Sequence, residues 1–394
     1  STSKSMAIQA LQLHTTVRDD LPALLAVTAF QMNADNGGVQ TDPTIFKALS
    51  AISSDQVVLR GHQDAVRAVV LTENGKELYS CGDDSRVLYW NRDETSKPPV
   101  PVEIPPNMQE SFRSIILTRD GKWLAAGTSG GKIIVWKKPF LQNKPMVFTD
   151  HHATVNKLAA DPNRNRFFSC GSDGRLLQWQ YEGDTFTNFL VDSVPGAIRS
   201  LAIRPDGQKL IYTTGDGLVK SFMINQTSAR PVTLLNLRVP VLSATFSGDG
   251  EILALGCQDA SIRIYHPAVV PLIGETLLGR HLSAITGLAF SPGNNELASC
   301  SFDWTVKFSE FPAKEENTVA IEGHEKWVYD VLFTPDCKNL ISCSADKTIR
   351  ISSTRNGEMA EKLKQKLSRN LTPEEWKKMV GEDIPYHKTR EHLP

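Results

Sequence analysis

The sequence predicts an all-β fold, a seven-bladed β-propeller with short helical extensions at both ends. Two regularities predict it. Seven units each begin with an apolar anchor residue, and successive anchors lie 43 to 46 residues apart, within the range of propeller blades. A turn residue follows 18 residues after every anchor. The anchors are Val66, Phe112, Val155, Ile198, Val241, Ile285 and Val328, and the turn residues are Asp84, Gly130, Asp173, Asp216, Asp259, Asp303 and Asp346.

The last unit shows the strands of one blade most clearly. Residues 326–352 contain an apolar run, a turn at Thr334–Asp336, a second apolar run, a tight turn at Ala345–Lys347 and a third run of alternating residues. This pattern is typical of three short strands joined by hairpins. Turns where Gly or Asn tolerates positive φ join the first two strands of other units. They are Asn74-Gly75, Asp120-Gly121, Asp206-Gly207, Asp249-Gly250 and Gly293-Asn294.

The fourth strand of a blade comes from the stretch that leads into the next unit. Residues 57–62 (VVLRGH) match residues 319–324 (VAIEGH), yet they precede the first unit and have no blade of their own. The last unit, in turn, has three strands and no fourth. We therefore expect residues 56–60 to supply the fourth strand of blade seven, because closing the ring removes open sheet edges. The predicted propeller spans residues 56–354.

Helical patterns replace the strand pattern at both ends. Residues 1–55 form a predicted N-terminal extension, with helix starts at Asp20-Leu21-Pro22 and Thr41-Asp42-Pro43. Residues 355–394 form a predicted C-terminal extension with a helix at Met359–Leu367 and an extended tail. Before its second helix, Thr372 is the expected N-cap and Glu375 completes a capping box. The apolar faces of these helices need a surface to pack on, either the propeller or an upstream domain.

Composition argues against several classes of function. The 394 residues carry a net charge of −1, so the chain lacks the basic field that a nucleic-acid partner requires. No run of about 18 apolar residues occurs, which predicts no membrane insertion by this segment. We expect no signal peptide in this segment. The cysteine usage described below favours a reducing compartment, so the expected location is cytoplasmic, with a periplasmic one left open. The chain begins with Ser rather than Met, so we expect a processed chain or a piece of a longer protein.

Four of the six cysteines lie three residues before the turn Asp of their own units: Cys81, Cys170, Cys300 and Cys343. Equivalent positions on successive blades point the same way, so we expect small buried core residues rather than disulfides. No CxxC, HExxH or GxxxxGK[ST] string occurs. We therefore expect no metal site and no nucleotide or other cofactor site.

The units resemble the WD40 family of β-propellers. The hallmark of that family is Gly-His before the first strand, Ser or Thr in the second, Asp in the turn and Trp ending the third. The matching residues are His62, Ser80, Asp84 and Trp90 in unit one; His151, Ser169, Asp173 and Trp179 in unit three; His281, Ser299 and Asp303 in unit six; and His324, Ser342 and Asp346 in unit seven. Unit two is the poorest match, with Gly130 at the Asp position, and units four and five have Phe222 and Tyr265 in place of Trp.

The repeated His, Ser and Asp also suggest a hydrolase. A catalytic triad would appear once, not four times in register. The WD40 resemblance instead implies a structural network, in which the Asp accepts from the His, the Ser links them and the Trp N–H completes the set. A satisfied buried network of this kind rigidifies a blade. We therefore expect no enzyme activity.

The chain ends carry a second resemblance. The string RNLTPEEW at Arg369–Trp376, followed by Gly-Glu and Pro-Tyr, is similar to the C-terminal tail of bacterial WD40 proteins. The segment Leu24–Phe30 resembles the helices that precede the propeller in that group. There the propeller is often the C-terminal module of a large protein, behind a nucleotide-binding region, a caspase-like peptidase or a kinase. This resemblance implies a bacterial multidomain protein.

Three arginines occupy the position after the anchor, near the entrance of the central funnel: Arg67, Arg113 and Arg199. They predict a basic patch for an acidic or phosphorylated peptide, with solvated rim charges as the alternative.

Three aromatic residues are further candidates for partner binding: Trp327, Tyr329 and Trp304. Packing between neighbouring blades is the alternative for Trp304, and a structural role is also open for Trp327. The favoured hypothesis is a monomeric interaction module that binds a protein or peptide on the funnel face. The alternative is a regulatory sensor domain that controls an upstream catalytic or nucleotide-binding module.

Overall fold

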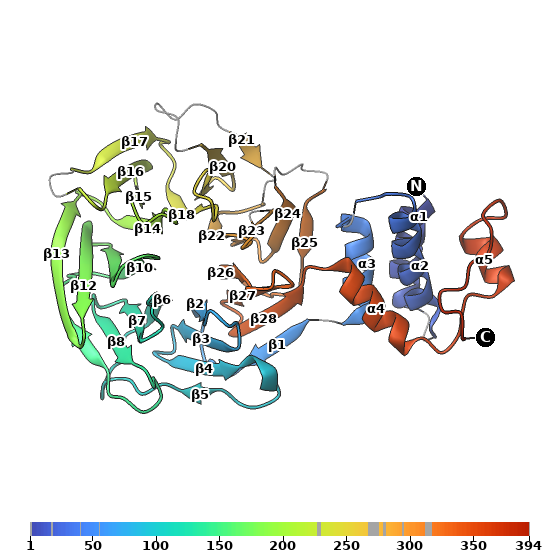
Figure 1. Cartoon of the computed structure of the whole chain (residues 1–394), viewed down its shortest axis with the longest axis horizontal. Helices are drawn as coiled ribbons and strands as arrows, with labels where there is room; N and C mark the ends of the chain where they lie inside the picture. The colour runs from blue at the N-terminus through green and yellow to red at the C-terminus, as the bar shows by residue number, and fades with distance from the viewer. Residues whose placement is uncertain are drawn as a thin grey trace. The chain divides into compact units, whose positions relative to one another are not determined.

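The computed structural model describes residues 2–16, 19–39, 41–54, 56–226, 230–266, 276–278, 281–293, 295–311 and 317–393. Seven four-stranded sheets are arranged in a ring, as Figure 1 shows. This confirms the predicted seven-bladed β-propeller with helical extensions. We number the blades one to seven in chain order of their innermost strands.

Each blade has four strands, which we describe from the innermost, next to the centre of the ring, to the outermost. The innermost strands are β2 (Val66–Leu71), β6 (Phe112–Leu117), β10 (Val155–Ala160), β14 (Ile198–Ile203), β18 (Val241–Phe246), β22 (Ile285–Phe290) and β26 (Val328–Phe333). The second strands are β3 (Glu77–Gly82), β7 (Trp123–Thr128), β11 (Arg166–Gly171), β15 (Lys209–Thr214), β19 (Leu253–Cys257), β23 (Glu296–Ser301) and β27 (Asn339–Ser344).

The third strands are β4 (Val87–Asn91), β8 (Ile133–Lys137), β12 (Arg175–Glu182), β16 (Leu218–Met223), β20 (Ile262–Tyr265), β24 (Val306–Glu310) and β28 (Thr348–Ser353). The outer strands are β5 (Val100–Pro101), β9 (Met146–Phe148), β13 (Thr185–Ser193), β17 (Val232–Asn236), β21 (Thr276–Leu278), β25 (Val319–Ile321) and, for blade seven, β1 (Val57–Arg60). A short 3₁₀ helix, η1 (Arg92–Glu94), follows β4.

The anchors form the inner core of the ring. Every anchor is the first residue of an innermost strand, and every one has an exposed fraction of 0%. Burying a side chain of this size contributes roughly 1.5–3 kcal/mol. Around them, aromatic residues of adjacent blades pack together, as where Trp123 of β7 meets Phe186 of β13 with ring centroids 4.9 Å apart. The fixed spacing in the sequence therefore follows from one buried contact repeated around the ring.

The second turn of every blade has the same backbone conformation. The residue after the turn Asp, or after Gly130 in blade two, has a φ between 58° and 92°. These residues are Ser85, Gly131, Gly174, Gly217, Ala260, Trp304 and Lys347. In the first turns, Gly75, Gly121, Gly207 and Gly250 also have positive φ, as the sequence predicted. The predicted turn at Gly293-Asn294 includes Asn294, which lies outside the described residues.

The four cysteines predicted to be core residues are buried and unpaired, at the same position of their second strands. The strand β1 lies beside β28, and the seventh sheet has the order β1-β28-β27-β26. Blade seven thus combines residues from the start of the propeller with residues from its end, as Figure 1 shows.

Five helices form from the ends of the chain: α1 (Thr2–His14), α2 (Leu21–Asp35), α3 (Pro43–Ser53), α4 (Asn356–Lys366) and α5 (Pro373–Met379). Helix α3 is capped by Asp42, whose carboxylate accepts from the N–H groups of Thr44 and Ile45. Helix α5 has the predicted capping box, with the Glu375 N–H 3.1 Å from the Thr372 hydroxyl. Helix α4 begins three residues before the predicted Met359.

Helix α2 has apolar residues on all sides, because α1, α3 and α4 surround it. At its start the Asp20 carboxylate makes no capping bond. It accepts instead from the Ser368 N–H at 2.8 Å, which ties the two chain ends together.

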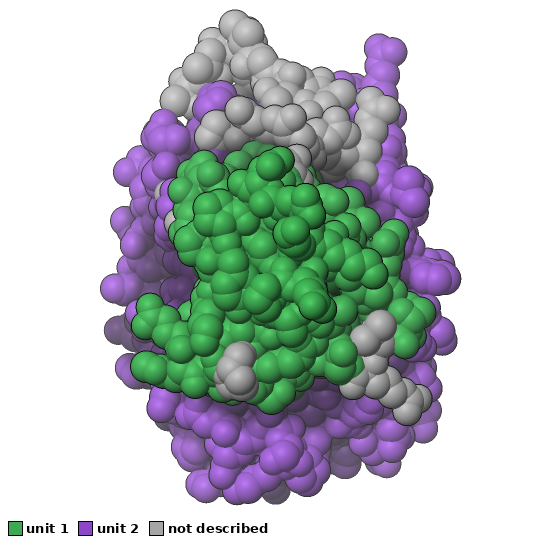
Figure 2. Space-filling model, turned by 90° about the vertical axis from the view of Figure 1, so that its right-hand side faces the viewer, with its two compact units in different colours: residues 1–57, 316–321, 351–394 green, residues 58–315, 322–350 purple. Residues whose placement is uncertain are grey.

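The chain divides into two compact units, coloured separately in Figure 2. Residues 1–57, 316–321 and 351–394 make up the first unit, which contains the helices. Residues 58–315 and 322–350 make up the second, which contains most of the propeller strands. Among the described residues, every helix is too short or too polar to cross a membrane.

Candidate partner-binding face

The His, Ser and Asp of blade one form a single hydrogen-bonded network. His62 precedes β2, Ser80 lies in β3 and Asp84 lies in the turn after it. The His62 Nδ1 is 2.9 Å from an Asp84 oxygen, and its Nε2 is 2.8 Å from the Ser80 Oγ. The Trp90 indole donates to the same Oγ at 2.8 Å. Because a carboxylate only accepts, Nδ1 donates to Asp84, and in a neutral imidazole Nε2 then accepts from the serine hydroxyl.

Blade three repeats this arrangement. His151 Nδ1 lies 3.0 Å from Asp173, its Nε2 lies 2.8 Å from Ser169 Oγ, and Trp179 donates to that Oγ at 2.8 Å. The backbone N–H groups that follow the His and the turn also bind the Asp carboxylate. The network therefore connects the loop before the blade to its second turn.

Blades six and seven keep the His, Ser and Asp but lack the Trp. His281 lies 2.9 Å from Asp303, and His324 lies 2.7 Å from Asp346. A threonine hydroxyl two residues after each Asp donates to its carboxylate, at 2.7 Å in blade six and 2.6 Å in blade seven. A local donor thus strengthens the Asp side of these two networks.

Protonation states follow from burial and hydrogen bonding. Burial alone would raise the pKa of Asp84, but donation from His62 and from backbone N–H groups outweighs it, and the pKa lies below its ordinary value. The pKa of His151 and of His324 is lowered, mainly because burial disfavours the imidazolium. The Ser80 side chain has an exposed fraction of 0%, and its hydroxyl oxygen is bound by both His62 and Trp90. These networks hold the turns in place.

Blade two achieves a similar contact with different residues. Glu110, in the loop before β6, accepts from the Thr128 hydroxyl and the Lys132 ammonium, each at 2.6 Å. A Cβ on Gly130 would lie 2.3 Å from the Glu110 carboxyl carbon, so Gly130 leaves the space that this carboxylate fills. Sequence reasoning missed Glu110 because it lies outside the fixed spacing. The available signal was a Gly at an Asp position together with an acidic residue in the preceding loop.

In blades four and five the turn Asp bonds locally. Thr214 donates its hydroxyl to Asp216, and the Ser261 hydroxyl donates to Asp259 at 2.5 Å. The arginine Arg263 also donates to Asp259, at 2.9 Å. The loops before these blades therefore have no histidine tie to the turn.

The residue after each anchor is a β-bulge in all seven blades. The register between the first two strands shifts at that position every time. A bulge re-aims a side chain out of the regular ladder. The residues so placed are Arg67, Arg113, Asn156, Arg199, Leu242, Thr286 and Tyr329.

Two of the three predicted arginines meet at one carboxylate. Arg67 Nε donates to Asp83 at 2.8 Å, and Arg113 lies 3.2 Å from the other Asp83 oxygen. Two guanidinium groups thus share one acidic group, which leaves one positive charge in excess. Burial and the neighbouring Arg67 charge lower the pKa of Arg113. Arg199 is exposed and is paired with no acidic group among the described residues.

Tyr329 connects this charged cluster to aromatic residues. The Arg67 guanidinium lies 4.0 Å from the centroid of the Tyr329 ring. Phe302 packs edge-on against Tyr329, with ring centroids 6.0 Å apart, and lies tilted against Trp327, with ring centroids 4.9 Å apart. Because Trp327 is 51% exposed, this row of side chains ends in an open aromatic surface. We call the row Arg113, Asp83, Arg67, Tyr329, Phe302 and Trp327 the arginine–aromatic band.

Two more apolar residues are exposed at the same end of blade six. Leu282 is 93% exposed, and its N–H donates to the Asp303 carboxylate at 2.8 Å. Trp304, directly after Asp303, is 51% exposed. With φ at 74°, Trp304 occupies a conformation that costs a bulky residue roughly 1–2 kcal/mol. The alternative role for Trp304 was packing between neighbouring blades. Any such packing leaves about half of the side chain exposed.

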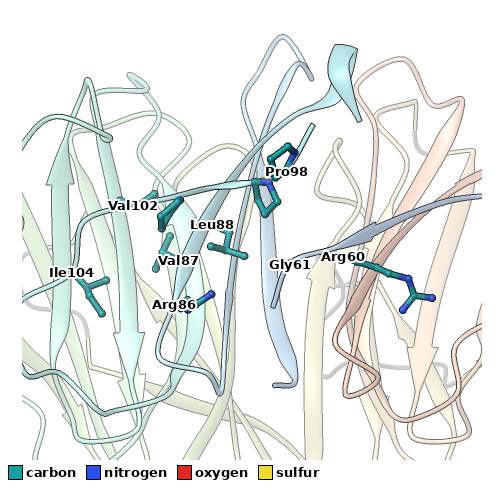
Figure 3. Close-up of a pocket in the computed structure, with 10 residues that line it drawn as sticks. Arg60, Gly61, Arg86, Val87, Leu88, Pro98, Val102 and Ile104 are labelled. Atoms are coloured by element: carbon teal, nitrogen blue, oxygen red, sulfur yellow. The ribbon is translucent and has the colours of Figure 1, made fainter. Parts of the chain in front are cut away.

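Blade one also has a cavity of about 480 Å³, within the size range of small-ligand sites. Figure 3 shows Val87, Leu88 and Val102 gathered on one side and Arg60 apart from them on β1. Prolines of the outer segment complete the lining, which includes Pro98, Pro99 and Pro101. The walls are mostly apolar, so the cavity suits an apolar side chain rather than an ion.

The fold and the site together define a propeller of repeated blades, tied by buried His–Ser–Asp networks in four of the seven. Comparison with protein families agrees. The model for the WD domain, G-beta repeat (WD40) matches residues 53–91, 143–180, 275–308 and 315–351. These segments correspond to blades one, three, six and seven, the four that keep the network. The chain therefore contains four segments that match the WD40 repeat, and they lie within a seven-bladed β-propeller.

The chain is also similar to several known proteins over part of its length. The chain is 31% identical to human striatin-3 over 130 residues, which cover 28% of this chain and 16% of striatin-3. It is 21% identical to mouse striatin over 292 residues, 70% of this chain and 32% of striatin. It is 27% identical to rat echinoderm microtubule-associated protein-like 2 over 214 residues, 53% of this chain and 31% of that protein. The chain thus spans less than a third of the length of each of these relatives.

Proposed function

We propose that this propeller is a protein-interaction module and that the arginine–aromatic band is its binding face. Its preferred partner is a peptide or protein segment with an acidic residue beside a bulky apolar one. The observation that carries this proposal is the unequal charge of the Arg67, Asp83 and Arg113 cluster, joined through Tyr329 to an exposed tryptophan.

The charge argument is one of complementarity. One carboxylate holds two half-buried guanidinium groups in fixed positions, with side-chain exposures of 22% for Arg67 and 30% for Arg113. Pre-positioned arginines lose little entropy when they bind a second carboxylate, and each charge-assisted bond is stronger than a neutral one. An acidic ligand group would neutralise the excess charge.

The apolar argument concerns exposed area. Trp304, Trp327 and Leu282 are exposed large side chains, of a kind that commonly anchors a partner. Trp304 also keeps a strained backbone without the benefit of burial. The ring positions these groups rigidly, so a partner binds without a large ordering cost in the propeller.

Binding of a peptide library tests the proposal. The library pairs each peptide that has Asp or Glu next to Trp, Phe or Leu with a copy in which the acid is replaced by its amide. Wild-type protein should prefer the acidic copies. Trp327→Ala should weaken binding about 30-fold, the effect of a typical hot-spot residue of about 2 kcal/mol.

Two arginine variants separate the cluster from general surface charge. Arg113→Gln should weaken binding of the acidic peptides about tenfold and abolish the preference over their amides, since one charge-assisted hydrogen bond is worth roughly 1.5 kcal/mol. Arg199→Gln is the matched control, because Arg199 is a funnel arginine outside the cluster, and it should bind as wild type does. Equal losses in the two variants, or no preference for acidic copies, would contradict the proposal.

A further inference from the structure

The outer strand of blade three differs from the other outer strands that the structure describes. Strand β13 has nine residues, while the other outer strands have between two and five. It is the last strand in the order β10-β11-β12-β13, so it pairs on one side only. Figure 1 shows it along the outer rim of the ring. Radial repetition usually leaves only short, protected edges, and β13 departs from that pattern.

The edge of β13 lacks the residues that usually prevent pairing with another strand. Residues 185–191 (TFTNFLV) contain no charged residue and no proline. Phe189 is 48% exposed and Leu190 is 50% exposed. Soluble proteins normally protect such an edge with Lys, Pro or a very short strand, as in β5, where Val100–Pro101 is only two residues long. A long, uncharged edge with exposed apolar side chains is a ready template for another strand.

The charges beside this stretch point to the identity of the second strand. Asp184 precedes the uncharged stretch and is paired with Lys137 at 2.6 Å, and Asp192 follows it and is paired with Lys220 at 2.5 Å. Both acidic residues are thus already neutralised within the chain. A basic partner segment would gain little from them, whereas a second uncharged strand meets no repulsion.

A copy of β13 itself has the required properties. Two copies related by a two-fold axis place the strand antiparallel to itself, which is the self-complementary contact of a closed dimer. Centred on Asn188, the pairing sets Phe186 opposite Leu190 and Thr187 opposite Phe189 of the other copy. At each end Asp184 faces Asp192 of the other copy, and both carboxylates are paired with lysines of their own chain.

We propose that β13 pairs antiparallel with β13 of a second copy of this chain, which joins blade three of each copy into one continuous sheet. The dimer is closed, because each copy has one such edge among its described outer strands. This replaces the monomer expected from the sequence, and it is independent of the proposed binding face, whose residues lie in blades one, two, six and seven.

Sedimentation velocity of the whole chain over a range of concentrations tests the proposal. Wild-type protein should shift from the mass of one chain to that of two as concentration rises. Phe189→Lys places a charge on the exposed edge and should shift the dissociation constant upward at least tenfold. Val232→Lys is the matched control, because Val232 is 59% exposed on the outer strand β17, and it should dimerise as wild type does.

Thermal unfolding monitored by circular dichroism verifies that both variants fold. A second edge variant, Leu190→Lys, should also weaken the dimer. Agreement between the two variants would show that the loss does not come from a local distortion caused by Phe189→Lys alone. Three outcomes would overturn the proposal: a wild-type monomer at every concentration, an open series of larger oligomers, or a dimer that both edge variants leave intact.

Discussion

Blades one and two solve the same structural problem with different residues. In blade one, the turn Asp84 accepts from His62 of the preceding loop, and both side chains are buried. In blade two the turn has Gly130, and the carboxylate comes from the loop itself, as Glu110 paired with a half-exposed Lys132. The comparison teaches that these two blades both join loop and turn through a carboxylate, although different residues supply it. The two solutions differ in burial, so we expect them to differ in what they contribute to the free energy of unfolding.

The largest expected difference between the two blades is in the free energy of unfolding that is lost when each carboxylate is removed. Asp84→Ala leaves the His62 Nδ1–H and two backbone N–H groups without an acceptor, and it should lower the free energy of unfolding by about 3 kcal/mol. Glu110→Ala should cost only about 1 kcal/mol, because water can solvate the released lysine. Urea unfolding of the two variants measures both values, and equal losses would show that the contacts are equivalent.

Placing an Asp in the turn of blade two tests whether Glu110 occupies the space that the turn Asp fills in other blades. Gly130→Asp forces a second carboxylate against Glu110, so it should destabilise the blade by about 2 kcal/mol. Adding Glu110→Ala should recover about 1 kcal/mol of that loss, as expected for residues in contact. The double-mutant cycle is measured by the same urea titration. Strictly additive losses would mean that Glu110 and the turn do not compete for one space.

Lowering the pH to 5.5 should reduce the stability that the histidine networks contribute, but not the contribution of the Glu110 contact in blade two. We expect this effect to be smaller than those of the substitutions above. The folded-state pKa of His151 and of His324 is below the ordinary value, so the unfolded chain binds more protons as pH falls below about 6.5. Their contribution is complete above that pH and decreases below it, by at most about 1.4 kcal/mol per histidine at pH 5.5.

Glu110 also has a lowered pKa, but a carboxyl group titrates only near pH 4 and below. Stability measured at pH 7 and pH 5.5 should therefore fall in the wild type and fall less in His151→Asn/His324→Asn. An identical pH dependence in both proteins would contradict the assignment of neutral buried histidines.

The repeat spacing made most of the fold predictable. Each anchor, such as Val66, had to recur because it fills the same position on the ring, and a fixed 18-residue interval fixes the hairpin between anchor and turn. The positions of His62, Ser80 and Asp84 followed from the same interval. The domain boundaries at residues 55 and 354 and the bacterial multidomain origin stay predictions.

The binding face was less predictable, because its contacts join different blades. Asp83 was visible in the sequence, yet its two arginine partners lie in the first strands of two different blades. Likewise, the stacking of Arg67 on Tyr329 connects residues 262 positions apart. Only the ring geometry and the bulge at each of these positions bring them together.

The closing strand β1 has a consequence for how the protein is made. A ribosome produces β1 before any other strand of the propeller and β28 after all of them, so two neighbouring strands of blade seven are synthesised far apart in time. Until β28 emerges, β1 has no sheet to join and the growing chain ends in an open edge. The first six blades are therefore synthesised before the final hairpin of blade seven. A chain stalled during translation would be an unclosed arc of blades, whose exposed sheet edges could pair with other chains.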